Sequence, residues 1–193
     1  MHSFWQRLNA IFFYCLSLLG FLSFCAAGTT YWHVAEPQIT LSLKKLSLRK
    51  IHGAGHDQAI MHLGIDADLR SVFNWNVKQL FVYITAEYET SANVLNQVVV
   101  WDKIISDKRH AHIKSTSVAN KYSLTDQGFG LRDNNVTLAL SWNIVPSTGL
   151  LGMHHGYSDA FSFDVPDEYT STTKADNLDA ARLAAAKAAR PIT

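Results

Sequence analysis

The hydrophobic pattern begins with a long uncharged run near the N-terminus. Residues 8–32 contain no acidic or basic side chain. As an α-helix rising about 1.5 Å per residue, this run of about 25 residues would cover roughly 37 Å, enough for a hydrocarbon core of about 30 Å with its interfaces. Trp5 precedes the run and Tyr31 and Trp32 end it, where aromatic rings of membrane interfaces are found. The pattern predicts a transmembrane helix over 8–32.

A cleavable secretory signal is the competing interpretation of the same run. Cys25, Ala26 and Ala27 precede Gly28, and small residues of this kind are typical of a cleavage site. The apolar core over 8–24 is longer than the usual signal core of about 7 to 15 residues. The sequence therefore favours a retained anchor, with cleavage after Ala27 as the alternative.

The orientation of the anchor is not decided by charge. Arg7 and the terminal amine on one side are offset by Lys44 and Lys45 on the other. The single N-x-[ST] sequon, at Asn135, would make sense as a glycosylation site in a lumen, with an unmodified turn asparagine as the alternative. We therefore expect a cytosolic N-terminus over 1–7 and a lumenal domain over 33–170.

Downstream of the run, apolar and polar residues alternate with a period of two. Strands are predicted near 39–48, 61–69, 80–88, 98–105, 136–144 and 161–165, with a weaker one near 122–124. The first strand slips in phase at Lys44, as at a bulge. Residues 98–105 are apolar on both faces, which predicts a central strand. Residues 106–120 are indecisive, and 149–156 are predicted to be a loop.

Short strands without helical periods between them indicate one all-β domain, an antiparallel β-sandwich behind the transmembrane helix. The composition changes over 171–193, where residues 180–190 are rich in alanine after N-cap residues. This segment is expected to be a short helical or disordered tail, because an alanine face buries little apolar area.

Charge and cysteine content narrow the class of protein. The chain has 17 Lys and Arg against 16 Asp and Glu, so it lacks the basic field that neutralises phosphates, and nucleic acid is not an expected partner. Both cysteines, Cys15 and Cys25, lie within the apolar run. The β-domain must therefore be stable without disulfides.

The sequence predicts no catalytic, cofactor-binding or metal-binding residue. Three histidine pairs are predicted to be solvated, because metal sites usually recruit cysteine or carboxylate as well; they are His52 and His56, His110 and His112, and His154 and His155. Asp66 and Asp68 share a strand face. They are predicted to be solvent-facing acids, which are more common than a catalytic carboxylate pair. No serine lies in a nucleophile motif.

Aromatic and amide residues are dense in a few places. Trp101 and Trp142 are predicted to pack in the sandwich core, as large aromatics usually do. Phe73 and Trp75 lie in a connection between strands, where aromatics are often partner contacts. These two residues are the candidate partner contacts.

Several segments closely resemble the signal peptidase complex subunit 3 family. They are residues 73–81 (FNWNVKQLF), 86–88 (AEY), 95–104 (LNQVVVWDKI), 135–146 (NVTLALSWNIVP) and 163–166 (FDVP). The likeness includes the N-terminal anchor and covers roughly residues 1 to 170, so the tail lies outside it.

The resemblance implies a noncatalytic subunit of the signal peptidase complex, single-pass in the endoplasmic reticulum membrane, with a lumenal β-domain. It implies partners among the complex's catalytic serine subunit and its other small subunits, together with the lipid bilayer. The family sequon coincides with Asn135. The alternatives are a secreted or membrane-tethered β-sandwich that binds a ligand, and an independent hydrolase.

Overall fold

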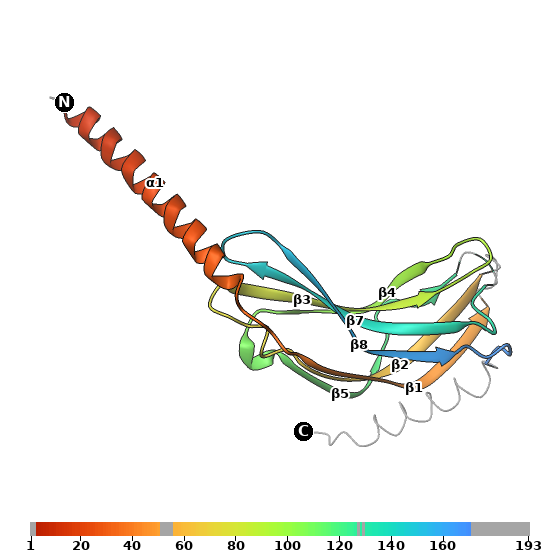
Figure 1. The fold of residues 1–193 in the computed structure, drawn as a ribbon. Coiled ribbons are helices and arrows are strands. Elements are labelled where there is room, and N and C mark those ends of the chain that lie inside the picture. The colour runs from red at the N-terminus through yellow and green to blue at the C-terminus, as the bar shows by residue number, and fades with distance from the viewer. Residues whose placement is uncertain (1–2, 51–55, 127, 129, 171–193) are drawn as a thin grey trace, which may run out of the picture.

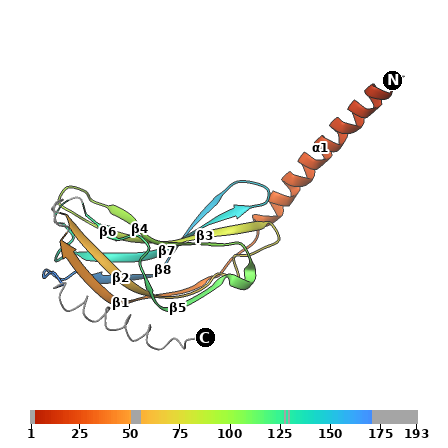
Figure 2. The same ribbon diagram turned by 180° about the vertical axis from the view of Figure 1, so that it is seen from behind.

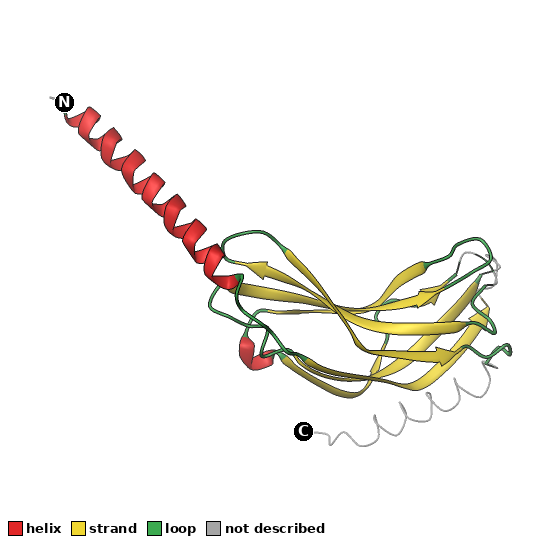
Figure 3. Cartoon of the chain, in the orientation of Figure 1, coloured by secondary structure: helices red, strands yellow, loops and turns green. Residues whose placement is uncertain are grey.

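The computed structural model describes residues 3–50, 56–126, 128 and 130–170. One long helix projects from one end of two antiparallel sheets (Figure 1), and the view from behind shows the same arrangement (Figure 2). The alanine-rich tail and the loop that contains His52 lie outside the described residues. The predicted fold class, an all-β sandwich with one N-terminal apolar helix, is confirmed (Figure 3).

The helix, α1 (Phe4–Thr30), buries none of its residues against the rest of the chain. It starts earlier than the apolar run because the hydroxyl of Ser3 accepts a hydrogen bond from the backbone N–H of Gln6 (3.3 Å), as an N-cap does. Its mean hydropathy and length are sufficient to cross a membrane. A helix with no buried face differs from the core helix of a soluble protein, which is apolar because protein covers it.

Two sheets form the sandwich. Sheet A has the order β1-β2-β5, with β6 also paired to β2. Its strands are β1 (Gln38–Lys50), β2 (Asp57–Asp68), β5 (His112–Ala119) and β6 (Leu124–Thr125). Sheet B has the order β4-β3-β7-β8. Its strands are β3 (Val77–Tyr88), β4 (Asn96–Ile105), β7 (Asn135–Pro146) and β8 (Gly152–Asp164), and a short 3-10 helix, η1 (Lys108–His110), precedes β5.

The core lies between the two sheets and follows the predicted alternation. Its largest contributions from sheet B are fully buried aliphatic residues of β3 and β7, namely Leu80, Val82, Ile84, Val136, Leu138 and Leu140. Trp101 and Trp142 belong to the same cluster, which confirms their predicted packing. The phase slip is also confirmed, because the register of β1 against β2 shifts between Leu43 and Lys45.

The prediction that 98–105 forms a central strand is wrong. β4 is an edge strand of sheet B, and its Val99 and Ile104 are exposed. The central strands are β3 and β7, which pair with each other over nearly their whole length. Apolar residues on both faces therefore marked an edge strand here, since an edge can leave an apolar side chain uncovered.

Two further segments differ from the sequence prediction. Residues 149–156 were expected to be a loop, but β8 begins at Gly152 and pairs with β7, with Met153 opposite Asn143. The indecisive polar segment contains β5, which pairs with β2. In both segments, hydrogen bonding to a neighbouring strand outweighs a composition that carries little β signal of its own.

Candidate membrane-proximal interaction site

Three connections meet the C-terminal end of α1 at one end of the sandwich. They are the linker 31–37, the loop 69–76 and the β7–β8 hairpin tip 147–151. Figure 1 shows the hairpin between β7 and β8 beside the last turns of α1. The three segments and α1 line a cavity of about 900 Å³ that opens between helix and sandwich. We call this end of the molecule the membrane-proximal end.

Asn76 fixes the hairpin to the loop. Its side chain is 3% exposed. The Nδ2 group donates to the carbonyl oxygen of Thr148 (2.8 Å), and Oδ1 accepts from the backbone N–H (3.0 Å) and the hydroxyl (3.1 Å) of Thr148. The backbone N–H of Ser147 also donates to the Asn76 carbonyl oxygen (2.7 Å). The hairpin is therefore held to its neighbour by hydrogen bonds at both edges of one buried amide.

The loop around Asn76 follows from its amide-rich sequence. The side-chain oxygen of Asn74 accepts from the backbone N–H of Asn76 (2.9 Å), which is the local turn that asparagine favours. Val72 and Phe73 are buried beside it. The apolar residues hold the loop against the core, and the asparagines satisfy its backbone.

The hairpin tip lies against the helix itself. Gly149 has a φ of +109°, a backbone conformation that favours glycine. A Cβ atom added to Gly149 would lie 3.2 Å from the Cβ of Ala27. Phe24, Ala27 and Leu150 line the same cavity. Close approach of the backbone to α1 is therefore a second reason for glycine at this position.

The linker between helix and sandwich also contacts the sandwich. The Nε2 atom of His33 lies 2.9 Å from the carbonyl oxygen of Ser71, and Ala35 packs against the core. The chain enters β1 three residues later, at Gln38. The sandwich is thus tied to the end of α1 through the linker, the loop and the hairpin together.

Exposed apolar side chains gather at this end. Leu150 is 93% exposed, Leu151 70% and Trp75 65%, and Tyr31, Trp32 and Val34 are exposed to a similar extent.

Phe73, by contrast, is 8% exposed and belongs to the core. Of the two candidate partner contacts, only Trp75 has a free ring surface. Leu150 and Leu151 are not among the contacts predicted from the sequence, although two adjacent leucines between Pro146 and Gly152 were a usable signal.

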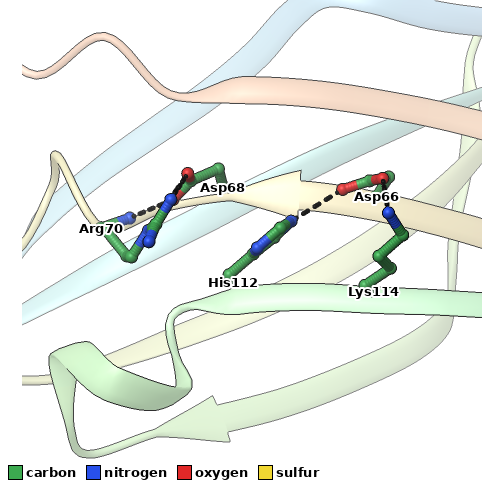
Figure 4. A network of polar contacts seen from close by, with 5 residues as sticks. All are labelled: Asp66, Asp68, Arg70, His112 and Lys114. Atoms are coloured by element: carbon green, nitrogen blue, oxygen red, sulfur yellow. Dashed lines mark hydrogen bonds and ion pairs between the residues drawn. The ribbon is translucent and has the colours of Figure 1, made fainter.

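Asp66 and Asp68 do not form a carboxylate pair. Figure 4 shows that each binds its own cation. Asp66 Oδ1 lies 2.9 Å from His112 Nε2, with Lys114 Nζ 3.6 Å from Oδ2, and Asp68 binds the guanidinium of Arg70. Hydrogen bonding to His112 lowers the pKa of Asp66, and hydrogen bonding to Arg70 lowers that of Asp68. A general acid needs a raised pKa instead, so these two carboxylates act as members of surface ion pairs.

The histidines that the structure describes are dispersed. His56 precedes β2, His110 is exposed in η1, and His112 pairs with Asp66. His154 and His155 lie in β8. Within the described residues, no group of three or more His, Cys, Asp and Glu is arranged to hold a metal ion. Cys15 and Cys25 are free thiols on the exposed surface of α1.

Asn135 is the exposed first residue of β7, at the opposite end of that strand from Pro146. Its Nδ2 group donates to Asp164 Oδ1 (2.7 Å), and the Thr137 and Ser162 hydroxyls lie 2.9 Å apart. Twelve residues of strand cover about 40 Å. The sequon therefore lies far from the membrane-proximal end.

The fold and this end of the molecule define a β-sandwich carried on an N-terminal helix of membrane-spanning length. Residues 1–168 match the family described as signal peptidase subunit. Signal peptidase complex subunit 3 of Drosophila melanogaster is 41% identical over 157 residues, covering 78% of this chain and 88% of its own length. The Gallus gallus protein of that name is 39% identical over 178 residues, and the Homo sapiens protein 38% over 178, each covering 89% of this chain and 98% of its own length. The chain belongs to the signal peptidase subunit family.

Proposed function

We propose that this protein is a noncatalytic subunit of the signal peptidase complex, which stabilises and positions the catalytic subunit that cleaves signal peptides in the endoplasmic reticulum. The observation that carries the proposal is the family match over residues 1–168, which includes both α1 and the sandwich. The relatives named signal peptidase complex subunit 3 align over nearly their whole lengths. An alignment of that extent favours the same place in the same assembly.

The geometry supports a positioning role. A partner bound to the sandwich would be held at a set distance from the membrane, because the linker, the loop 69–76 and the β7–β8 hairpin all tie the sandwich to α1. Trp75 is our candidate contact with another subunit, since its ring is exposed in the loop 69–76, close to the contacts that join the sandwich to α1. Large exposed aromatic rings are frequent anchors of protein interfaces.

The proposed topology is single-pass, with residues 1–7 cytosolic and the sandwich in the lumen of the endoplasmic reticulum. The exposed sequon at Asn135 supports it, because N-glycosylation takes place on the lumenal side. The competing function is a secreted β-sandwich that binds a ligand. The small residues Cys25, Ala26 and Ala27 before Gly28 are the one feature that favours it.

Affinity purification of the tagged full-length chain in mild detergent tests the proposal. We expect recovery of a signal peptidase catalytic subunit, and no cleavage of signal peptides by the chain purified away from it. Recovery without a catalytic subunit would overturn the assignment. Cleavage by the chain alone would support an independent hydrolase instead.

N-terminal sequencing of the mature protein separates the two topologies. An intact N-terminus fits the anchored subunit, whereas a mature chain that begins at Gly28 and leaves the cell would establish the secreted module.

A further inference from the structure

The β7–β8 hairpin reaches alongside α1 rather than stopping at its end. Gly149 approaches Ala27, and Leu150 lines the same cavity as Phe24. Ala27 lies three residues before the last residue of α1, Thr30, and Phe24 lies six before it. At about 1.5 Å per residue, the hairpin tip therefore overlaps roughly the last 5 to 9 Å of the helix.

That overlap places the tip at membrane depth if α1 spans a bilayer. Tyr31 and Trp32 follow the helix and mark the level of the headgroups, where aromatic side chains concentrate. The tip lies next to residues on the bilayer side of this pair. A segment at that depth meets the boundary between headgroups and acyl chains instead of bulk water.

The chemistry of the tip fits that environment. Residues 147–153 read STGLLGM and carry no charge. Leu150, Leu151 and Met153 are all exposed, and no described residue of the chain covers them. Three neighbouring apolar side chains left uncovered on a hairpin mark an interaction surface for an apolar environment.

The hairpin is also built to keep its position. Its backbone polar groups at Ser147 and Thr148 are bonded to Asn76, as described above. This matters at the membrane boundary, because unsatisfied backbone groups are costly where water is scarce. The tip can therefore present leucine side chains to lipid while the backbone at its base is satisfied by the sandwich.

We propose that the β7–β8 hairpin is a second membrane contact of this protein, with Leu150 and Leu151 inserted beside α1 into the leaflet on the side of the sandwich. The occupant of this surface is lipid. A second contact beside α1 restricts the tilt of the sandwich relative to the membrane, in addition to its height. The inference depends on α1 as a membrane span and not on the signal peptidase role.

Fluorescence quenching in lipid nanodiscs tests this contact in the full-length chain, without other subunits. A polarity-sensitive fluorophore is attached to Leu150→Cys in a background that carries Cys15→Ser and Cys25→Ser. The matched control is Val94→Cys, a similarly exposed apolar residue (84%) on the β3–β4 connection at the far end of the sandwich. Native Cys15, labelled in a Cys25→Ser chain, reports the span itself.

We expect blue-shifted emission from position 150, with quenching by spin-labelled lipids several-fold stronger than at position 94. Position 15 should be quenched as well. Emission at 150 like that at 94 would overturn the proposal while leaving the span intact if position 15 is quenched. A blue shift without quenching by lipid would also overturn it, because protein would then cover the tip.

Leu151→Cys is the second reporter, so that poor folding of one labelled chain does not decide the outcome. Failure of lipid to quench position 15 would overturn both the span and the hairpin contact. Loss of the signal peptidase assignment, in contrast, would change none of these measurements.

Discussion

The side chain of Asn76 and the backbone of Thr148 exchange hydrogen bonds in both directions, 72 residues apart in sequence. Because Asn76 is almost fully buried, its side chain meets little competition from water for these bonds. They join the loop before β3 to the hairpin after β7, and so connect two of the three segments that meet the end of α1. The Asn76 amide therefore helps to hold the hairpin in place, together with the backbone hydrogen bond from Ser147 to Asn76.

Asn76→Ala is expected to destabilise the sandwich by about 1 to 3 kcal/mol, since it leaves part-buried backbone groups of Thr148 unpaired. Urea unfolding of the purified chain in detergent, followed by tryptophan fluorescence, measures this. Asn93→Ala is the matched control, because Asn93 is exposed in the far β3–β4 connection and its amide donates to the side chain of Asn96. That change should cost less than about 1 kcal/mol. Equal losses in the two variants would contradict the role given to Asn76.

Phe73 and Trp75 lie two residues apart, and we expect them to have different roles: Phe73 in the core and Trp75 in a partner contact. Phe73→Ala should cost about 3 to 5 kcal/mol of folding free energy, because it opens a cavity in the core. Trp75→Ala should change stability by less than about 0.5 kcal/mol. It should nevertheless weaken recovery of other subunits in the affinity purification. Tyr122→Ala removes another exposed aromatic ring, from the segment between β5 and β6, and serves as the control. Unchanged recovery with Trp75→Ala would remove this contact.

The sequence predicted the parts of the fold that depend on burial. The alternation through β7 identified the buried face from Val136 to Trp142, and the phase slip at Lys44 marked the shift against β2. These signals are local, because an inward-facing residue must be apolar whichever strand lies beside it. The same logic found α1, whose composition must suit a membrane without help from the sandwich.

The order of strands was not accessible from the same signals. The apolar faces of residues 98–105 predict a central strand, but β4 is an edge strand. Strand order depends on which chain segments pair, and composition does not report pairing. The membrane-proximal end was missed for a related reason. Asn76, Thr148 and Ala27 come from three distant segments, and only the fold brings them together. A buried asparagine in a connection looks the same in sequence as an exposed one.

Asn135 is expected to carry an N-linked glycan if the sandwich is lumenal. Asn135→Gln and Thr137→Ala should each abolish the mobility shift that glycosidase digestion produces on a gel. Because Asn135 is exposed, its replacement should leave the folding free energy within about 1 kcal/mol of wild type, the value of its one bond to Asp164. Asn134→Gln, next to the sequon, keeps the acceptor and is the control. An unshifted wild-type chain from a glycosylating cell would argue against a modified lumenal Asn135.

Tyr88 should give the sandwich a stability change at alkaline pH. Burial and the hydrogen bond from its hydroxyl to Asp126 (3.0 Å) raise the pKa of Tyr88 to about 12, above the ordinary value near 10. A raised pKa means that the contribution is complete below about pH 10 and is lost as pH rises through about 12. Wild type should therefore be more stable than Tyr88→Phe near pH 8 by about 1 kcal/mol, the value of the hydrogen bond.

Between about pH 10 and 12, this stability difference between wild type and Tyr88→Phe should shrink and then reverse. The total change should be on the order of 2 kcal/mol, because the wild-type phenol ionises in the unfolded chain but not in the folded one. The urea midpoints of the two chains, determined across this pH range, measure the difference in stability. The titration of all groups that the two chains share cancels in this difference. A difference that stays constant with pH would show that Tyr88 ionises freely in the folded protein.

Arg132 and Arg109 offer a comparison between a part-buried and an exposed ion pair. Arg132 Nε lies 3.4 Å from Oδ2 of Asp57, whose side chain is fully buried, and its guanidinium lies 5.3 Å from the centre of the Tyr169 ring. The Tyr169 hydroxyl donates to the other oxygen of Asp57 (2.8 Å). Arg132 thus links the start of β2 to the segment after β8, and it compensates a charge that water does not reach.

Arg132→Gln is expected to destabilise the sandwich by about 2 to 4 kcal/mol, because it leaves the Asp57 carboxylate buried with less compensation. Arg109→Gln removes an ion pair with Asp107 on the exposed surface of η1 and should change stability far less than Arg132→Gln does. The same urea titration measures both, and added salt distinguishes them further, since screening weakens the exposed pair and hardly reaches the buried carboxylate. If the two variants lost equal stability, the Asp57 charge would have to be compensated by groups other than Arg132.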